Sequence, residues 1–394
     1  MTVILDGISV RQRGETWLDD INLEFPRGMT TLLGPMMAGK TTLMRVAAGL
    51  LAPDRGRVVV GGKDVTRISV RKRSVAFVYQ QFINYPSLTV YENIASPLRL
   101  DAAYRRDGVD RRVREVAELM GLSRLLDRRP AELSGGQRQR TAIARALARP
   151  VDVLLLDEPL ANLDFKLREQ LRADLKAMFA DSPGVVLYST ADPNEALTFA
   201  APTVVLGEGR VRHTGDAADM YARPPTLTVA ATLSDPPLNL LPGVVRDGRI
   251  EVLGTSFPMP PAEVLGTSSP APSAEVLGTS FPVPPAGAAG RDVLVGVRPH
   301  QVTITRDRPG ALELPAEIRV AEVTGSATFL HLLLQDGRHL VAQLPGTRRF
   351  TPGETTVAYV DPAHVFVFGE DGDRLPSTGD RLPSTGAAEV DPHG

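Results

Sequence analysis

The sequence predicts an α/β domain with a mainly parallel sheet, followed by an all-β domain. Up to about residue 235, short apolar runs alternate with helical patterns, which is typical of a layered α/β fold. Beyond that point the runs become short strands separated by turns. The 394-residue chain also carries 13 of its 33 prolines before position 236 and 20 from there on, although the second part is shorter. At roughly 100–200 residues per domain, this length predicts at least two domains.

Six apolar runs in the first part have the length and composition of buried strands. They are Met29–Leu33, Val58–Val60, Val75–Val78, Val153–Leu156, Val185–Tyr188 and Val204–Leu206. Because helical patterns separate these runs, we expect the strands to form one mainly parallel sheet in a domain that covers residues 1–235.

The second part reads as a series of short strands. Their apolar residues are Leu294, Val295, Val297, Val302, Ile304, Ile318, Val320, Phe329–Leu334, Leu340–Leu344 and Val357–Val360. Asp336-Gly337, between two of these segments, is a hairpin-turn signal. We therefore expect an all-β domain over residues 236–370.

Two tandem repeats interrupt this pattern. Residues 251–285 hold three proline-rich copies that begin EVLGTS at a period of 12, and residues 372–386 hold GDRLPST twice. Three short polar copies are too few to build a solenoid. We expect a repeat-expanded surface loop at 251–285 and a disordered tail at 371–394.

The composition excludes several kinds of protein. The chain has no cysteine, which removes disulfides and thiolate metal sites and suits a reducing compartment. Its 44 basic and 46 acidic residues nearly balance, which argues against a nucleic-acid partner. The N-terminus does not read as a signal peptide, and without a stretch of 18 apolar residues no segment is expected to span a membrane.

A phosphate-binding loop follows the first of the predicted parallel strands. Gly34-Pro-Met-Met-Ala-Gly39-Lys40-Thr41 fits the pattern G-x-x-x-x-G-K-[ST] and stands before a helical run at Leu43–Leu50. In such a loop, backbone N–H groups at the helix N-terminus bind phosphate. Lys40 would neutralise the β and γ oxygens, and Thr41 would offer its hydroxyl to Mg²⁺.

Two further segments carry polar groups suited to nucleotide chemistry. The strand Val153–Leu156 ends in Asp157 and Glu158, at the sheet edge where α/β proteins bind ligands. Asp157 can orient Mg²⁺ there, and Glu158 can polarise an attacking water. Ser134, followed by Gly135-Gly136-Gln137, is a good N-cap for the helical run behind it, and the glycines leave N–H groups free to approach an anion.

In this order, the motifs resemble those of the ATP-binding subunits of ABC transporters, and the resemblance covers nearly the whole chain. Walker A spans Gly34–Thr42, the signature LSGGQRQR spans 133–140, and Walker B ends in Asp157-Glu158. Gln80 stands in a Q-loop within VYQQFINYPSLTVYENI, and Asp164 ends a D-loop, LANLD.

The all-β part resembles a regulatory domain of the same family. GVRPHQVTI at 296–304 looks like the OB-type (TOBE) domain that is appended to importer ATPases for sugars and related carbohydrates. More narrowly, QQFINYPSLTVYENIASPLR and SDPPLNLL look like the ATPase subunits of glycerol-type importers, in which two different ATPases pair.

The resemblance implies an ATPase coupled to solute import, with ATP and Mg²⁺ as cofactors and a helical subdomain at about 84–140. Two subunits would sandwich two ATP molecules, and each site would take its signature motif from the other subunit. The implied nucleotide contacts are Gly34, Met37, Ala38, Gly39, Lys40, Thr41, Thr42, Ser134, Gly135, Gly136, Gln137 and Asp164. The implied metal contacts are Thr41, Gln80 and Asp157, and the implied catalytic residues are Glu158 and Gln80.

The same resemblance implies the partners and the location. The subunit would lie peripherally on the cytoplasmic face of the membrane, bound to two multi-span permease subunits and serving a solute-binding protein. The segment from Gln80 to about Ser96 would form part of the groove that receives a helix of the permease.

One departure from the family pattern concerns hydrolysis. The family usually places a γ-phosphate-contacting histidine after the strand that follows Walker B, but here that position is Ala191, and the first histidine of the chain is His213. Losing one such contact typically costs about 10²–10³ in rate. We expect the site on this chain to bind ATP and hydrolyse it slowly, and a non-identical ATPase to pair with it. In the alternative, other groups replace the histidine and both sites work.

Other departures concern the nucleotide contacts. Where the family stacks adenine on an aromatic side chain, this sequence has Arg13, which could stack through its guanidinium plane. Trp17, the only tryptophan, is either a substitute for that aromatic or part of the core. Met36, Met37 and Ala38 replace the usual small residues of Walker A but retain the backbone donors, so binding should survive.

Two other classes of function remain open from the sequence. One is a regulatory subunit, in which ATP only dimerises the chains and the OB-like part binds a small ligand or a signalling partner. The other is an ABC ATPase that acts on ribosomes or DNA. Such proteins usually carry tandem cassettes or a coiled-coil insertion, whereas this chain has one phosphate loop and no heptads.

Overall fold

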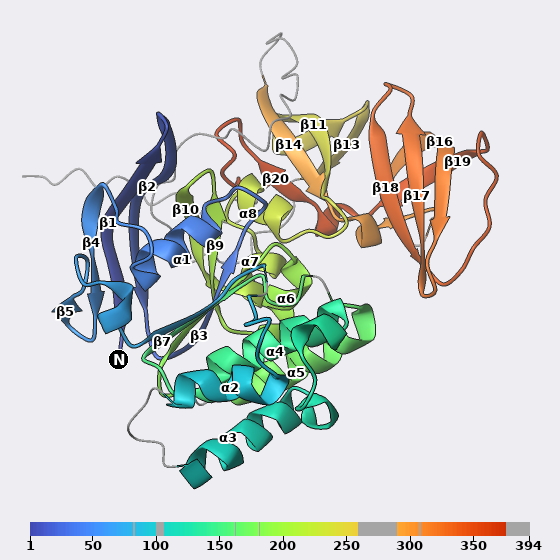
Figure 1. The fold of residues 1–394 in the computed structure, drawn as a ribbon. Coiled ribbons are helices and arrows are strands. Elements are labelled where there is room, and N and C mark those ends of the chain that lie inside the picture. Colours follow the sequence, from blue (N-terminus) through green and yellow to red (C-terminus); the bar gives the residue numbers. More distant parts are fainter. Residues whose placement is uncertain are drawn as a thin grey trace, which may run out of the picture. The chain divides into compact units, whose positions relative to one another are not determined.

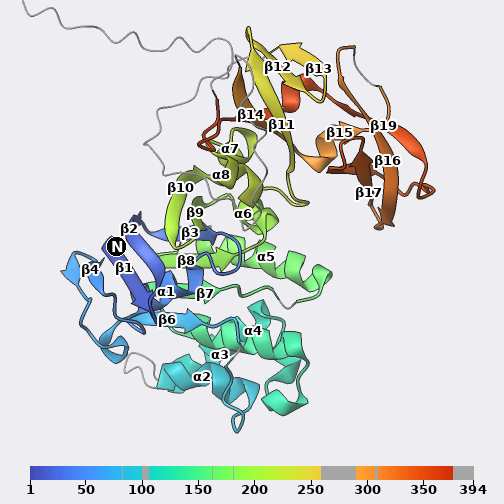
Figure 2. The same cartoon turned by 90° about the horizontal axis from the view of Figure 1, so that it is seen from above.

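The protein is described by a computed structural model that covers residues 1–81, 83–99, 106–161, 163–180, 182–258, 290–306 and 309–375. It divides into two compact units, Met1–Ala222 and Arg223–Gly394 (Figures 1 and 2). In the described residues no helix combines the length and the apolarity that crossing a bilayer requires.

The boundary between the units precedes the expected one at 235/236. Helix α8 (Leu227–Thr232) lies in the second unit, where Leu227 and Ala230 are buried against Phe366 and Phe368. An apolar face on so short a helix is stabilised by tertiary packing rather than by propensity, so the segment joins the unit that covers it.

The first unit is built around a six-stranded sheet with the strand order β10-β9-β3-β8-β7-β6. The strands are β3 (Gly28–Leu33), β6 (Val75–Val78), β7 (Val153–Asp157), β8 (Val185–Thr190), β9 (Pro202–Gly207) and β10 (Arg210–Asp216). All neighbouring pairs are parallel except β9 and β10. The predicted parallel sheet is confirmed.

Both faces of this sheet are covered, and alternate residues of each strand face opposite sides. In β8, Val185 and Leu187 join the core beside α1 (Lys40–Ala48), whereas Val186 and Tyr188 join the core on the other face. A strand that is buried on both sides has a continuous apolar sequence, which is why these strands could be predicted.

A second, antiparallel sheet in this unit has the order β2-β1-β4-β5. Its strands are β1 (Val3–Gln12), β2 (Glu15–Phe25), β4 (Arg55–Val60) and β5 (Lys63–Asp64). The expectation that Val58–Val60 lies in the parallel sheet is wrong, because β4 pairs antiparallel with β1. The sequence analysis missed β1 and β2.

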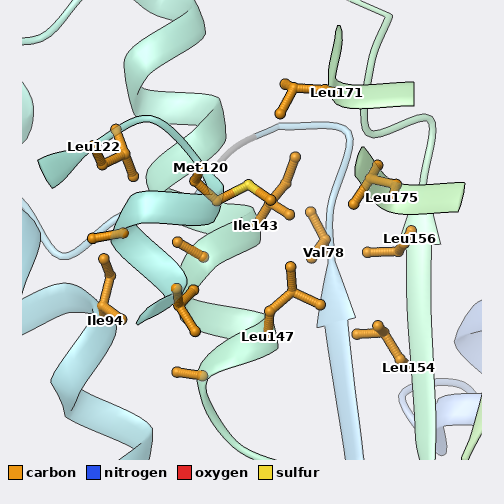
Figure 3. Packing of buried hydrophobic residues seen from close by; sticks show 14 of the residues in the cluster. Val78, Ile94, Met120, Leu122, Ile143, Leu147, Leu154, Leu156, Leu171 and Leu175 are labelled. Carbon is orange, nitrogen blue, oxygen red and sulfur yellow. The ribbon is translucent and has the colours of Figure 1, made fainter. Parts of the chain in front are cut away.

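Helices α2 (Val90–Arg99), α3 (Arg106–Leu119), α4 (Gly135–Ala148) and α5 (Phe165–Ala180) gather on one face of the parallel sheet (Figure 1). Figure 3 shows the core they share with the strands, in which Ile143 and Leu147 of α4 lie near Val78 of β6. Helix α4 runs past the expected end of the helical subdomain at 140. Two short helices, α6 (Pro193–Phe199) and α7 (Ala217–Ala222), complete the unit.

The second unit is all-β apart from α8 and two short 3₁₀ turns, as far as its residues are described. One sheet contains β11 (Asn239–Arg246), β12 (Arg249–Val252), β13 (Thr255–Pro258), β14 (Arg291–Val297) and β20 (Phe366–Phe368). The other contains β15 (Val302–Thr303), β16 (Leu312–Val323), β17 (Ala327–Leu334), β18 (His339–Pro345) and β19 (Thr355–Val360). Asp336 and Gly337 form the predicted hairpin turn, and Gly337 adopts the left-handed φ of 84°.

The two repeat regions begin later than expected. The first copy of the 12-residue repeat supplies part of β12 and all of β13, so the expected loop cannot start at 251; residues 259–285 lie outside the described part. At the other end, residues 371–375 are ordered, because Arg374 pairs with Phe368 and the Leu375 N–H donates to the Val367 carbonyl at 2.8 Å. The rest of the expected tail also lies outside the described residues.

A buried ionic network ties α5 and α6 to β8. The Arg172 side chain, only 7 % exposed, lies 3.9 Å from Glu195 and 2.8 Å from Glu169. The Tyr188 hydroxyl donates to the other oxygen of Glu195 at 2.9 Å. Burial raises the pKa of the Glu195 carboxyl, and hydrogen bonds from Thr190 and Tyr188, together with the charge of Arg172, oppose that rise. The network therefore anchors the segment that follows the end of β8.

Removal of this buried carboxylate should be costly. We expect Glu195→Ala to lower the free energy of unfolding by about 3 kcal/mol, because Arg172 and Tyr188 would remain buried without it. Urea titration of the purified chain measures the loss.

The matched control is Glu169→Ala, which removes the shortest contact of the same arginine. Glu169 is 45 % exposed, so we expect a loss below about 1 kcal/mol. Equal losses in the two variants would contradict the view that burial, rather than distance, sets the strength of these pairs.

Candidate functional site

The phosphate loop lies between β3 and α1 at the carboxyl edge of the parallel sheet. Gly34 approaches β9 so closely that a Cβ would lie 2.4 Å from the Leu206 carbonyl oxygen. Gly39 has a φ of 99° and caps α1 without any side-chain hydrogen bond. No acidic residue stands in the first turn of α1, and the N–H groups of such a turn can bind phosphate.

Lys40 is the cation of this site. It is 5 % exposed, and its Nζ donates to the carbonyls of Gly34 at 2.6 Å and Pro35 at 2.9 Å. Nζ also lies 3.2 Å from Oε1 of Glu158. Burial lowers the pKa of Lys40, and the charge of Glu158 opposes that shift. The loop carbonyls thus aim the ammonium group at the end of β7.

Thr41 and Asp157 join the loop to β7. The Thr41 hydroxyl lies 2.8 Å from Oδ2 and 3.1 Å from Oδ1 of the carboxylate. Asp157 is 2 % exposed, and burial raises the pKa of its carboxyl, while hydrogen bonds from Ser189 and Thr41 oppose the rise. The structure therefore places these two predicted metal contacts side by side.

Glu158 and Gln80 form a second pair at the same edge. The Gln80 Nε2 donates to Oε2 of Glu158 at 3.0 Å, so the glutamine contacts the predicted base and not Asp157. Glu158 adopts a φ of 45°, a left-handed conformation that is uncommon for a side chain of this kind. This turn directs the carboxylate toward Lys40 and Gln80.

Ser189 is a polar residue of this edge that the sequence motifs do not predict. It lies at the end of β8, fully buried, and is the register partner of Asp157. Its hydroxyl donates to Oδ1 of Asp157 at 2.8 Å. The signal that could have found it is the alternation Val185, Leu187, Ser189, which puts a polar side chain on the face that carries α1.

Ser134, in the signature segment 133–140, is the N-cap of α4, as predicted. We call Ser134–Gln137 the signature turn. The Ser134 hydroxyl accepts the Gln137 N–H at 3.3 Å, and the Gln137 side chain accepts the Ser134 N–H at 2.9 Å, which forms a capping box at the start of α4. Ser134 and Gly135 are exposed, and Gly136 is half-buried. Asp164 lies near Arg140, since its charge opposes the burial that lowers the pKa of that guanidinium.

The residues considered for adenine stacking are both exposed. Arg13 lies in the turn between β1 and β2 with a φ of 52°. Trp17 is 40 % exposed, so the alternative that it forms part of the core is wrong. Its carbonyl oxygen would lie 3.1 Å from a Cβ on Gly39 and 2.6 Å from one on Gly209, so the Trp17 backbone packs against the phosphate loop. Of the two residues, Trp17 is the one that the structure places there.

Two of the three substituted positions in Walker A lie at the surface. Met36 and Met37 are 83 % and 98 % exposed, and Met37 has a φ of 65°, whereas Ala38 is buried. Ala191 follows β8 directly and is exposed, beyond Ser189 and next to the N-cap Asp192 of α6. The position expected to carry a histidine therefore lies at the same carboxyl edge as Asp157 and offers only a methyl group.

Two family models match the chain. The model described as ABC transporter matches residues 18–161, and the model described as TOBE domain matches residues 295–368. The first match contains the phosphate loop, the signature turn and the end of β7, and the second lies within the all-β unit.

Curated relatives are similar over most of the chain. The trehalose/maltose import ATP-binding protein MalK of Thermococcus litoralis is 37 % identical over 80 % of this chain and 84 % of the relative. The sn-glycerol-3-phosphate import ATP-binding protein UgpC of Paracoccus denitrificans is 33 % identical over 93 % of this chain and 96 % of the relative. The xylose/arabinose import ATP-binding protein XacK of Haloferax volcanii is 32 % identical over 91 % of this chain and 90 % of the relative.

A solved structure supports the same assignment for the first unit. It is the dimeric post-hydrolysis state of the ATP-binding cassette MJ0796 bound to ADP and phosphate, with a TM-score of 0.51 and 28 % identity over 55 % of this chain and 98 % of that one. Together the matches confirm an ABC ATPase domain followed by an OB-like TOBE domain. The chain belongs to the family of ATP-binding subunits of ABC importers, which are ATPases that power solute uptake.

Proposed function

We propose that this chain is an ATP-binding and ATP-hydrolysing subunit of an importer for a carbohydrate-like solute, namely glycerol or a related polyol or sugar. The observation that carries the proposal is the grouping of Lys40, Glu158 and Gln80 beside the Thr41–Asp157 hydrogen bond. The solute class rests on the relatives, which are named as importers of trehalose and maltose, sn-glycerol-3-phosphate, and xylose and arabinose.

The residues at this edge fit a magnesium–nucleotide complex. Thr41, Asp157 and Gln80 offer hydroxyl, carboxylate and amide oxygens, which are the hard ligands that Mg²⁺ prefers. In the part of the chain that the structure describes, no group of three or more His, Asp and Glu side chains could hold a metal alone. A magnesium ion at this edge would therefore take its remaining ligands from water and phosphate, as it usually does.

The other roles follow from position and charge. The loop N–H groups and Lys40 would bind the phosphates, and Mg²⁺ would neutralise charge that develops on them. Glu158, held by Gln80 and Lys40, would accept a hydrogen bond from the attacking water and orient it. Trp17 or Arg13 would stack on adenine.

We further propose that the two ATP sites of the assembled transporter differ. At its own site this chain presents Ala191, which cannot donate a hydrogen bond to developing phosphoryl charge. Its intact Ser134–Gln137 turn and Asp164 would complete the site of a second, non-identical ATPase subunit. Two permease subunits would hold the pair at the cytoplasmic face of the membrane, and a solute-binding protein would deliver the cargo.

A regulatory subunit is the second candidate, and two observations favour it. Ala191 lowers the expected hydrolysis rate, and the second unit carries a cavity of about 370 Å³. His300, Tyr359, Asp361 and His364 are among the residues that line it. In that case ATP binding would bring the subunits together, but hydrolysis at the two ATP sites to which this chain contributes would not power transport.

Restoring the missing donor should speed up this chain's own site. We expect Ala191→His to raise the ATPase rate of the purified chain by about 10-fold or more, since one well-placed donor is worth about 10²–10³ in rate. Steady-state phosphate release measures the change.

Ala191→Phe is the control, because it adds a ring of similar size without a donor and should leave the rate unchanged. If the unmodified chain alone already hydrolyses ATP as fast as the histidine variant, the slow-site proposal fails.

Two variants separate the roles of this chain in the assembled importer. Ser134→Arg should reduce solute-coupled ATP hydrolysis by about 100-fold or more, because it spoils the site completed on the partner. Glu158→Gln should leave the coupled rate within a few-fold, because it affects only the slow site. Both are measured in reconstituted vesicles with ATP binding verified.

The outcomes distinguish the alternatives. If the two variants reduce solute-coupled ATP hydrolysis equally, the chain's own site works at full rate. That result would contradict the proposal that the two ATP sites differ. A negligible effect of both would favour the regulatory subunit.

A further inference from the structure

The hydroxyl of Ser189 is a buried polar group at this edge to which neither the motifs nor the relatives' names assign a role. Ser189 is fully buried, and it stands opposite Asp157 in the parallel pairing of β7 and β8. Alternation along the two strands puts both side chains on the face that carries α1, where Thr41 lies. Three polar side chains therefore converge from β7, β8 and α1.

The direction of the Ser189 hydroxyl is fixed by its neighbours. Its oxygen accepts the backbone N–H of Glu158 at 3.1 Å, and an N–H can only donate. The single hydroxyl proton is thus left for Oδ1 of Asp157, 2.8 Å away. A hydrogen bond to a carboxylate in a buried site is stronger than one between neutral groups. One side chain thereby holds the carboxylate of Asp157 and the peptide of Glu158.

The second contact also bears on Glu158. Its N–H is shared between the Ser189 hydroxyl and the Ser189 carbonyl oxygen, the latter at 3.2 Å. Glu158 adopts its left-handed φ of 45° immediately after this N–H. Such a conformation persists only where surrounding contacts determine it.

We infer that Ser189 is a positioning residue for the metal–nucleotide site: it fixes the carboxylate of Asp157 against Thr41 and holds the peptide from which Glu158 turns toward Lys40. The inference rests on the proposed function, in which Asp157 contacts Mg²⁺. Alanine at position 189 would keep the strand and the packing but leave Asp157 with Thr41 as its remaining hydroxyl donor.

The test is nucleotide binding with and without magnesium. A fluorescent ATP analogue is titrated into the full-length chain in Mg²⁺ and, separately, in EDTA. We expect Ser189→Ala to weaken binding about 10-fold in Mg²⁺, the size of one lost hydrogen bond to a charged group, and by less than about twofold in EDTA.

Thr31→Val is the matched control. Thr31 is also fully buried, pairs with β8 through Tyr188, and has a hydroxyl without a hydrogen-bond partner in the described structure. Its loss should leave both affinities within about twofold of the unmodified chain. Thermal unfolding of each variant reports whether the fold is retained.

The results separate two failures. If Ser189→Ala weakens binding of the ATP analogue equally in Mg²⁺ and in EDTA, or weakens it in neither, the positioning role is overturned. If the unmodified chain binds equally well in Mg²⁺ and in EDTA, the proposed magnesium site itself fails.

Discussion

The hydrogen bond between Thr41 and Asp157 is the constraint on which the site depends, because it joins residues 116 positions apart in the chain. It requires β3, β8 and β7 to lie side by side and parallel, so that the phosphate loop and the two carboxylates leave the same sheet edge. Helices on both faces make that arrangement stable. The core thus positions the side chains of the site.

The predictable part of this site is local in sequence. The phosphate loop follows from eight consecutive residues after an apolar strand, and the capping box of Ser134 and Gln137 follows from four. Ser189 was not predictable in this way, because its role comes from its register with Asp157 on another strand. The contact between Gln80 and Glu158 is equally non-local, because it joins residues 78 positions apart in the chain.

Other features were hidden for identifiable physical reasons. Strands β1 and β2 are joined with several register shifts, which break the alternation of buried and exposed residues that marks a strand. Residues 251–258 look like the start of a repeat in the sequence. In the structure, however, β12 pairs with β11 and forms a hairpin with β13, so most of these residues lie in strands. Trp17 is exposed although tryptophan is usually buried, and it is its backbone that packs against the phosphate loop at Gly39.

Counting bound Mn²⁺ by electron paramagnetic resonance, during an ATP titration of the full-length chain, tests most directly whether this sheet edge is a metal–nucleotide site. We predict one Mn²⁺ per chain that binds only with ATP and that Asp157→Asn removes. Asp152→Asn, just before the opposite end of β7, should leave the count unchanged. Metal binding that is independent of ATP, or that survives Asp157→Asn, would contradict the account.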